Sequence, residues 1–506
     1  MSVVSAATGY ALIGLWGGMM LALAYYIYRQ QGVDDTSEFV TAGGRAQLGL
    51  ATASFAVTWM WAGDVVGVPE YVGFVGIAGT WMYAAPAVLS GLLVIPFALR
   101  MRRLFPQGYT YSEYFIERFG RRAHLVVVLV ILYTMVLGGI VQLYVGGFVI
   151  GGLTGIDPNV VMGLLMLIIG LYILVGGLWG SLTTDFVQFV SAIILVVLFI
   201  PLLLFEAGGP GLVYEDMISN LGEEASVYLS MQHFDPIGDF FLPYALGLGV
   251  WGIVSLSTWQ RVFAVRRDKT TRFLTIGAIG VFTIISMYAV IGFVGLAAFE
   301  IDFTGEGGVH PENLSIEALG LLPEWSLILF MLVLLMVLGS STDSYLTALA
   351  SLTSRDIFYQ NVSRDASDEA QLWVARGASI FFAFIIFIGT VWALDNVGFV
   401  TLLLASGIGA TGLAGPFALS LFWHKTSSTG FITGVVCSQL VSAYLFLGSP
   451  ALPLWTEFPL WQIMAIGHAI AITLTLVVSL VNPDDFDFEA IEHSDATVRA
   501  DGGEER

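Results

Sequence analysis

The sequence has very little positive charge and almost no cysteine. Lysine occurs only at Lys269 and Lys425, and Lys and Arg total 19 against 39 Asp and Glu, which gives a net charge of −20. Such an acidic chain lacks the basic surface that neutralises phosphates, which excludes nucleic acid as a partner. The same acidity predicts a very salty medium, as around a halophilic prokaryote. The single cysteine, Cys437, excludes an internal disulfide and a zinc site built from cysteines.

Charged residues of either sign are also scarce. They make up 11% of the 506 residues, whereas hydrophobic residues make up 57%. Globular proteins carry about 25% charged residues. A soluble domain of this composition would expose large apolar patches to water and would aggregate. The composition therefore predicts an all-α polytopic protein of the cell membrane, with the lipid bilayer as its partner.

Apolar runs long enough to cross a bilayer, about 20 residues each, follow one another along most of the chain. We predict about thirteen transmembrane helices, at 6–28, 47–69, 75–99, 124–153, 159–177, 182–206, 238–262, 273–300, 325–355, 374–394, 398–423, 428–447 and 460–481. The first run has no basic residue before it, so we do not interpret it as a cleaved signal peptide.

The few basic residues segregate with these predicted spans. If the N-terminus is outside, every Lys and Arg falls in a cytoplasmic connection, at the cytoplasmic end of a predicted span or in the C-terminal tail. The long outer loops, 207–237 and 301–324, then contain Asp and Glu but neither Lys nor Arg. Since cytoplasmic loops are enriched in Lys and Arg, we predict N outside and C inside. The acidic, apolar-poor segment 482–506 predicts a disordered cytoplasmic tail.

Polar side chains inside the predicted spans are costly in a membrane and are candidates for function. In the second span, Asp64 lies between Gly63 and Gly67, and Pro69 follows. Glycine and proline weaken a helix, and a broken helix frees carbonyl oxygens that can bind a hard cation. The alternative is a kinked helix in which Asp64 faces an aqueous vestibule.

The ninth predicted span contains a run of hydroxyl groups beside a carboxylate. Segment 339–345 includes Ser340, Ser341 and Asp343. Neighbouring hydroxyls can supply oxygens to an ion, or they can bond back to carbonyls of their own helix.

A third polar segment opens the sixth predicted span. Segment 176–188 begins with two glycines, which predicts a tight inner turn, and it carries Thr184 and Asp185. Either residue could cap the helix that follows, or the carboxylate could lie on an ion path.

Other classes of function find little support. The sequence has no GxxxxGK[ST] phosphate loop, so an ATP-driven pump is not predicted, and it has no HExxH zinc motif. Its six histidines are scattered, and only His468 lies deep in a predicted span, whereas a haem would require paired histidines. No histidine is placed to serve as a base for Ser340 or Ser341. We therefore predict neither an enzyme nor a bound cofactor.

Several motifs, in order along the chain, resemble those of the sodium/solute symporter family. The similar stretches are Thr41-Ala42-Gly43-Gly44-Arg45 (AGR), Gly176-Gly177 through Thr184-Asp185 to Gln188 (GG…TDxxQ), Gln260-Arg261 with Ala264 (QRxxA), and Ser340 to Ser344 with Arg355-Asp356 (SSTxDS…RDI). The resemblance covers 39–448, which is most of the chain.

The resemblance implies a leucine-transporter-like fold, whose core is an inverted repeat of five plus five helices. Spans two to eleven would form that core. The implied division is an extra N-terminal helix with an inner loop at 1–46, the ten-helix core at 47–423, two C-terminal helices at 424–481 and the tail at 482–506.

The resemblance also implies a sodium ion, held between the first and eighth core helices, as the coupling ion. Its implied ligands are the backbone carbonyls of Val57, Met60 and Val337 and the hydroxyls of Ser340 and Ser341. Asp185 matches the family aspartate near the sodium exit path, and we assign its neighbour Thr184 and Asp343 to the same path.

The implied solute site lies beside the helix break. Its candidate residues are Trp59, Trp61, Asp64, Tyr83, Gln142 and Trp251, the last of which falls where family members often place an inner aromatic gate. The runs TWMWA and TWQR resemble the urea-transporting branch, whereas Gly67-Val68-Pro69 looks more like the proline and general branches.

Together these features predict a sodium-coupled secondary active symporter that imports a small polar solute. Urea is the favoured solute, followed by proline or another organic solute. The alternative is a proton-coupled or uncoupled carrier of the same fold, which would use Asp64 or Asp185.

Overall fold

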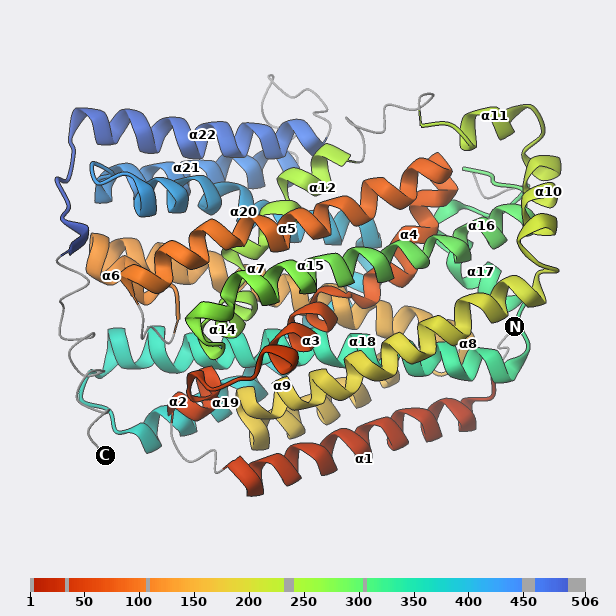
Figure 1. Cartoon of the computed structure of the whole chain (residues 1–506), viewed down its shortest axis with the longest axis horizontal. Helices are drawn as coiled ribbons and strands as arrows, with labels where there is room; N and C mark the ends of the chain where they lie inside the picture. The colour runs from red at the N-terminus through yellow and green to blue at the C-terminus, as the bar shows by residue number, and fades with distance from the viewer. Residues whose placement is uncertain are drawn as a thin grey trace.

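The computed structural model of the protein describes residues 4–31, 36–105, 110–231, 241–303, 307–447 and 460–489. Within these ranges the chain is helical, and the only extended pairings are two isolated bridges, Ala46 with Val265 and Ile301 with Val309. Figure 1 shows the long helices lying roughly lengthwise beside one another. The predicted all-α architecture is confirmed.

Ten helices in the described part of the chain are long and apolar enough to cross a membrane. They are built on α1 (Ala6–Gln31), α5 (Ile77–Leu104), α7 (Arg121–Val145), α9 (Pro158–Glu206), α15 (Thr270–Met287), α18 (Glu324–Ser351), α19 (Asp368–Asn396), α20 (Phe399–Phe422), α21 (Ser428–Leu447) and α22 (Leu460–Val481). The last two coincide with their predicted ranges. The protein is therefore a multi-pass membrane protein.

Shorter helices connect, extend or interrupt these ten. They are α2 (Thr36–Thr41), η1 (Ala42–Gly44), α3 (Leu48–Trp59), α4 (Ala62–Val75), α6 (Glu113–Phe119), η2 (Gly146–Ile150), α8 (Gly151–Thr154), α10 (Pro210–Leu221), η3 (Gly222–Glu224), α11 (Ala225–Tyr228), α12 (Leu242–Leu246), η5 (Leu248–Val250), α13 (Trp251–Val254), α14 (Leu256–Ala264), η6 (Arg267–Lys269), α16 (Ala289–Ala298), η7 (Pro311–Asn313), α17 (Leu314–Gly320) and η8 (Leu352–Val362).

The predicted span 47–69 is two helices, α3 and α4, and it extends to Val75. Helix α3 ends because Met60 has φ −84° and ψ 86° and Trp61 is extended. Side chains satisfy the backbone donors that this break exposes: the Asp64 carboxylate accepts from the Trp61 N–H at 2.8 Å, and the Gln142 amide oxygen accepts from the Ala62 N–H at 2.9 Å. The break therefore precedes the glycines that predicted it.

The predicted span 238–262 is also broken. Its described part, from residue 241, consists of α12, η5, α13 and α14, with Ser255 extended at φ −65° and ψ 110° between the last two. Four short pieces replace one long helix, which is why this segment is not among the ten long spans.

The predicted spans 159–177 and 182–206 are joined in α9 without the expected loop. A single residue, Gly177, has φ 51° and ψ −146° and separates two helical segments there. Glycine adopts this conformation at little cost. A Cβ atom at Gly177 would also lie 2.5 Å from the ring of Phe39. The predicted inner turn is therefore made by a single residue, Gly177.

Helix α18 lies through the middle of the helix bundle in Figure 1 and is the most buried of the ten long helices, with 78% of its apolar window inside the protein. It contacts α9, α7, α19 and α3. Because α18 carries the hydroxyl run, its polar side chains lie among other helices and not against lipid.

The first eight residues of the predicted disordered tail are packed against the helices. Residues 482–489 pack on the end of the bundle that carries α6, where the Arg118 guanidinium lies 4.1 Å from the ring centroid of Phe486 and the Asp484 carboxylate accepts from the Ser428 N–H at 2.7 Å. Its aromatic residues have a basic partner, which an acidic composition alone does not reveal. Residues 490–506 lie outside the described ranges.

Candidate functional site

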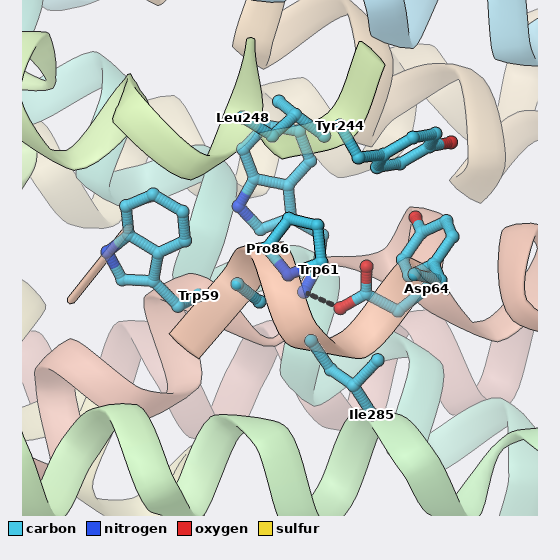
Figure 2. A pocket seen from close by; sticks show the side chains of 9 residues that line it. Trp59, Trp61, Asp64, Pro86, Tyr244, Leu248 and Ile285 are labelled. Atoms are coloured by element: carbon cyan, nitrogen blue, oxygen red, sulfur yellow. Dashed lines mark hydrogen bonds between the residues drawn. The ribbon is translucent and has the colours of Figure 1, made fainter. Parts of the chain in front are cut away.

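A small cavity, of about 30 Å³, lies at the break between α3 and α4. Its nine lining residues come from the broken helix, from α5, from the α12–η5 region and from α15: Trp59, Trp61, Asp64, Tyr83, Pro86, Ala87, Tyr244, Leu248 and Ile285. Figure 2 shows these side chains converging around the unwound turn. This volume exceeds the roughly 10 to 15 Å³ that one water molecule needs, so the cavity is small even for a small solute.

Four of the nine residues that line the cavity are aromatic. The rings of Trp59 and Trp61 are stacked, with centroids 6.4 Å apart, and Tyr83 and Tyr244 meet at 5.0 Å. Trp251 lies edge-on against Trp61 at 5.8 Å. The wall thus offers flat π faces to a planar or cationic group.

Asp64 is the one charged residue among those that line the cavity, and it is 3% exposed. Its Oδ2 accepts the Trp61 N–H at 2.8 Å, so the carboxylate caps the start of α4. A carboxylate at a helix N-terminus is stabilised by the helix dipole. The same side chain therefore maintains the break and faces the cavity.

The structure brings four of the six predicted solute residues, Trp59, Trp61, Asp64 and Tyr83, to this cavity. Gln142 and Trp251 contact the broken segment but do not line the cavity. Five lining residues were not predicted from the sequence: Tyr244, Pro86, Ala87, Leu248 and Ile285. The signal for Tyr244 was its position in an apolar run rich in glycine, but no spacing in the sequence linked that run to Asp64.

The residues predicted to bind sodium are all buried. Val57 lies on α3, Met60 directly follows that helix, and Val337, Ser340 and Ser341 lie on α18. The Ser341 hydroxyl donates to the carbonyl of Thr58 at 3.1 Å, which places the hydroxyl run of α18 against the last turn of α3. The Val57 carbonyl accepts from the Met60 N–H at 3.2 Å at that helix end. Ser340 donates instead to Asp185.

A buried polar network joins α3, α9, α14 and α18 beside this contact. Arg261 and Asp185, both inaccessible to solvent, form an ion pair at 2.9 Å. The Arg261 guanidinium also donates to the hydroxyl of Ser54 at 2.8 Å and to that of Ser344 at 2.6 Å. A buried ion pair is stable only when further hydrogen bonds satisfy both partners, and here neutral hydroxyls supply them.

Asp343 is a second buried carboxylate in this network. It accepts from Ser181 at 2.8 Å, from Tyr172 at 2.8 Å and from Thr184 at 3.3 Å. Ser181 also donates to Asp185 at 3.4 Å. The predicted ion-path residues Thr184, Asp185 and Asp343 thus lie together, with one guanidinium for two carboxyl groups in the network.

Four members of this network had no role predicted from the sequence: Ser54, Tyr172, Ser181 and Arg261. Arg261 was visible only as part of a motif near the end of an apolar run. Its partners lie 76 residues away at Asp185 and 207 residues away at Ser54, distances along the chain that no helical periodicity can connect.

This combination of a broken helix, a buried polar cluster and a cavity at the break is that of a membrane transporter. The model of the Sodium:solute symporter family matches residues 39–437. The chain therefore belongs to this family, whose members are transporters and not enzymes.

Two curated relatives are named as urea transporters. The chain is 26% identical to the urea-proton symporter DUR3 of Oryza sativa subsp. japonica, over 88% of this chain and 66% of that protein. It is 23% identical to the urea active transporter of Saccharomyces cerevisiae, over 74% of this chain and 54% of that protein. The chain thus spans less than two thirds of the length of either relative.

Solved structures show the same fold at low sequence identity. A Na⁺-coupled sialic acid symporter in a substrate-bound outward-open state superposes with a TM-score of 0.78 at 17% identity, covering 95% of this chain and 99% of that one. A transporter of the nucleobase-cation-symport-1 family gives 0.54 at 16% identity, covering 90% and 99%. The fold is accordingly leucine-transporter-like.

Proposed function

We propose that the protein is a sodium-coupled secondary active symporter that imports a small polar solute, with urea favoured, by alternating access. One observation carries this proposal: a single helix break, at Met60 and Trp61, borders both the aromatic cavity and the hydroxyl run of α18. A solute in the cavity and a cation beside Ser341 would share that unwound turn. Binding of one would therefore favour binding of the other.

The proposed sodium ligands are the carbonyls of Val57, Met60 and Val337 and the hydroxyls of Ser340 and Ser341. These are hard oxygen donors of the kind that unwound transporter helices present to cations. None of them is a carboxylate, so the ion can leave again. One charge crossing 100 mV gains about 2.3 kcal/mol, which sustains roughly fifty-fold accumulation of a neutral solute.

Urea is favoured because the cavity is small and aromatic and because the two relatives above are named as urea transporters. Proline or another organic solute remains the alternative from the sequence.

We propose a topology of thirteen spans with the N-terminus outside. Three spans add to the ten long helices. Two are the interrupted segments α3–α4 and α12–α14, and the third comes from counting α9 as two spans divided at Gly177. The inverted repeat of five plus five helices would occupy 47–423 in the cell membrane. The long outer loops, 207–237 and 301–324, contain Asp and Glu but neither Lys nor Arg, which supports this orientation.

Proton coupling is the second candidate. It is supported by the name of the rice relative, a urea-proton symporter, and by the excess of one carboxyl group over guanidinium in the Asp185–Asp343 network. A buried carboxyl group without a cationic partner is a natural carrier for a proton.

The test is uptake of labelled urea and labelled proline into proteoliposomes that contain the purified full-length chain. An inward sodium gradient is expected to drive accumulation of urea above its external concentration. Equal uptake with and without sodium would refute sodium coupling, and stimulation by an inward proton gradient would then identify the second candidate. Accumulation of proline in place of urea would retain the symporter and change its solute.

A further inference from the structure

The cavity at the break contains one carboxylate and no basic side chain among its nine lining residues. Oδ2 of Asp64 is occupied by the Trp61 N–H. Figure 2 shows the second carboxylate oxygen pointing away from that bond, into the space below Tyr244. Within the described ranges, Asp64 forms no ion pair with Lys, Arg or His within 4.0 Å. Tyr83 also interacts with the Asp64 side chain in this cavity, so a solute would share the second carboxylate oxygen with the tyrosine.

The surroundings of this oxygen favour a donor and disfavour an acceptor. The stacked indoles of Trp59 and Trp61 present π faces, which attract cations and planar N–H groups. Tyr83 and Tyr244 add hydroxyl groups to the same cavity. A solute N–H that donates to the carboxylate would form a charge-assisted hydrogen bond, the stronger kind.

A solute with its own carboxylate would meet the opposite situation. Its negative charge would enter a buried space beside Asp64 with no lining cation to offset the repulsion. Burying an unpaired charge is strongly unfavourable, and a like charge increases that cost.

We propose that Asp64 is the specificity-determining residue of the cavity and that it selects solutes presenting N–H donors or a positive charge while rejecting carboxylates. This inference rests on the proposed function in that it concerns the same cavity, and it narrows the solute class. Urea and guanidinium-like or amine solutes satisfy it. Proline and monocarboxylates do not.

The alternative to a role in selectivity is that Asp64 only caps α4. The variant Asp64→Asn separates the two roles, because the asparagine amide oxygen can still accept the Trp61 N–H while the negative charge is lost. Glu70→Gln is the matched control: Glu70 is a buried carboxylate on the same helix α4, and it does not line the cavity.

The experiment is equilibrium binding of labelled guanidinium, urea, proline and acetate to the purified full-length chain in detergent. The wild-type protein is expected to bind guanidinium and urea at least about tenfold more tightly than proline or acetate, a factor equivalent to one charge-assisted hydrogen bond. Asp64→Asn is expected to weaken guanidinium binding about tenfold. The difference in affinity between guanidinium and the two carboxylates, proline and acetate, should therefore become smaller. Glu70→Gln is expected to preserve the wild-type ratios.

Carboxylate binding by the wild type that equals guanidinium binding would overturn the inference. So would an unchanged selectivity ratio in Asp64→Asn, or failure of guanidinium and urea to bind at all. An equal effect of Glu70→Gln would also refute it, because the field of α4 would then be responsible. Charge-selective binding without sodium-driven uptake would refute the proposed function and leave this inference standing.

Discussion

At the scale of single residues, two serine hydroxyls of α18, those of Ser341 and Ser344, bond Thr58 at the end of α3. Replacing Ser341 with alanine removes the group that bonds the Thr58 carbonyl. We expect Ser341→Ala to raise the sodium concentration for half-maximal uptake about tenfold, since an interaction with a charged group is worth about 1.5 to 3 kcal/mol. The measurement is sodium-dependent solute uptake in proteoliposomes.

Ser326→Ala is the matched control for this variant. Ser326 is also a buried serine of α18, but its hydroxyl bonds to Pro323 at the start of the helix at 2.8 Å. Its sodium dependence should equal that of the wild type. If the double variant Ser340→Ala/Ser341→Ala keeps the wild-type sodium dependence, the assignment of sodium to these hydroxyls is wrong.

The buried ion pair between Arg261 and Asp185 can be tested through the free energy of unfolding. Arg261→Met leaves Asp185 buried without its ion-pair partner, which should destabilise the protein by about 3 to 5 kcal/mol. The double variant Arg261→Met/Asp185→Asn should recover a large part of that loss. Chemical unfolding in micelles measures both. Equal stability of the single and double variants would show that the pair is not energetically coupled.

The types of residue in the apolar runs predicted much of the site. The residues that were not predicted are those whose partners lie far away along the chain. Asp64, Ser341 and Asp185 stood out because polar groups in apolar runs are rare and costly. Tyr244 did not, because a tyrosine in an apolar run is common, and only the tertiary fold places it over Asp64. Arg261 was seen as a motif, but its bonds join segments far apart in the chain.

At the scale of elements, Gly177 determines how α9 divides. Gly177→Ala introduces a Cβ 2.5 Å from the Phe39 ring at a backbone φ of 51°, which L side chains rarely adopt. We expect a loss of about 1 to 3 kcal/mol or more, since non-glycine strain of this kind costs that much before any clash. The readout is the melting temperature of the purified protein.

Gly180→Ala provides the comparison within the same helix. A Cβ at Gly180 would meet no atom within 4 Å, and its backbone is ordinary. This variant should match or slightly exceed the wild-type melting temperature, because alanine favours helix over glycine. If Gly180→Ala lowered the melting temperature as much as Gly177→Ala, the backbone conformation of Gly177 would not be the cause of the loss.

Hydropathy predicted the unbroken helices well, since a long apolar run has one stable form in lipid. The breaks were located less well. The expected weak points were Gly63, Gly67 and Pro69, but α3 ends before them because Asp64 and Gln142 satisfy the exposed N–H groups of Trp61 and Ala62. Capping by a distant residue such as Gln142 leaves no local pattern in the sequence.

At the scale of the whole molecule, the proposed orientation can be tested with cysteine labelling. The native Cys437 is first replaced by serine, and a cysteine is then introduced at Glu215 in α10 or at Asp365 after η8, both of which are exposed. In intact cells, a membrane-impermeant maleimide should label Glu215→Cys but not Asp365→Cys. Permeabilised cells should show labelling of both. The reverse pattern in intact cells would invert the topology.

The four helices that meet at Arg261 also bear on how fast the protein could turn over. The guanidinium bonds Ser54 of α3, Asp185 of α9 and Ser344 of α18 from its own position on α14. Any rearrangement that slides one of these helices past the others must break several of these bonds together. The barrier would then be largely enthalpic, and the turnover rate would rise steeply on warming while solute affinity changed little.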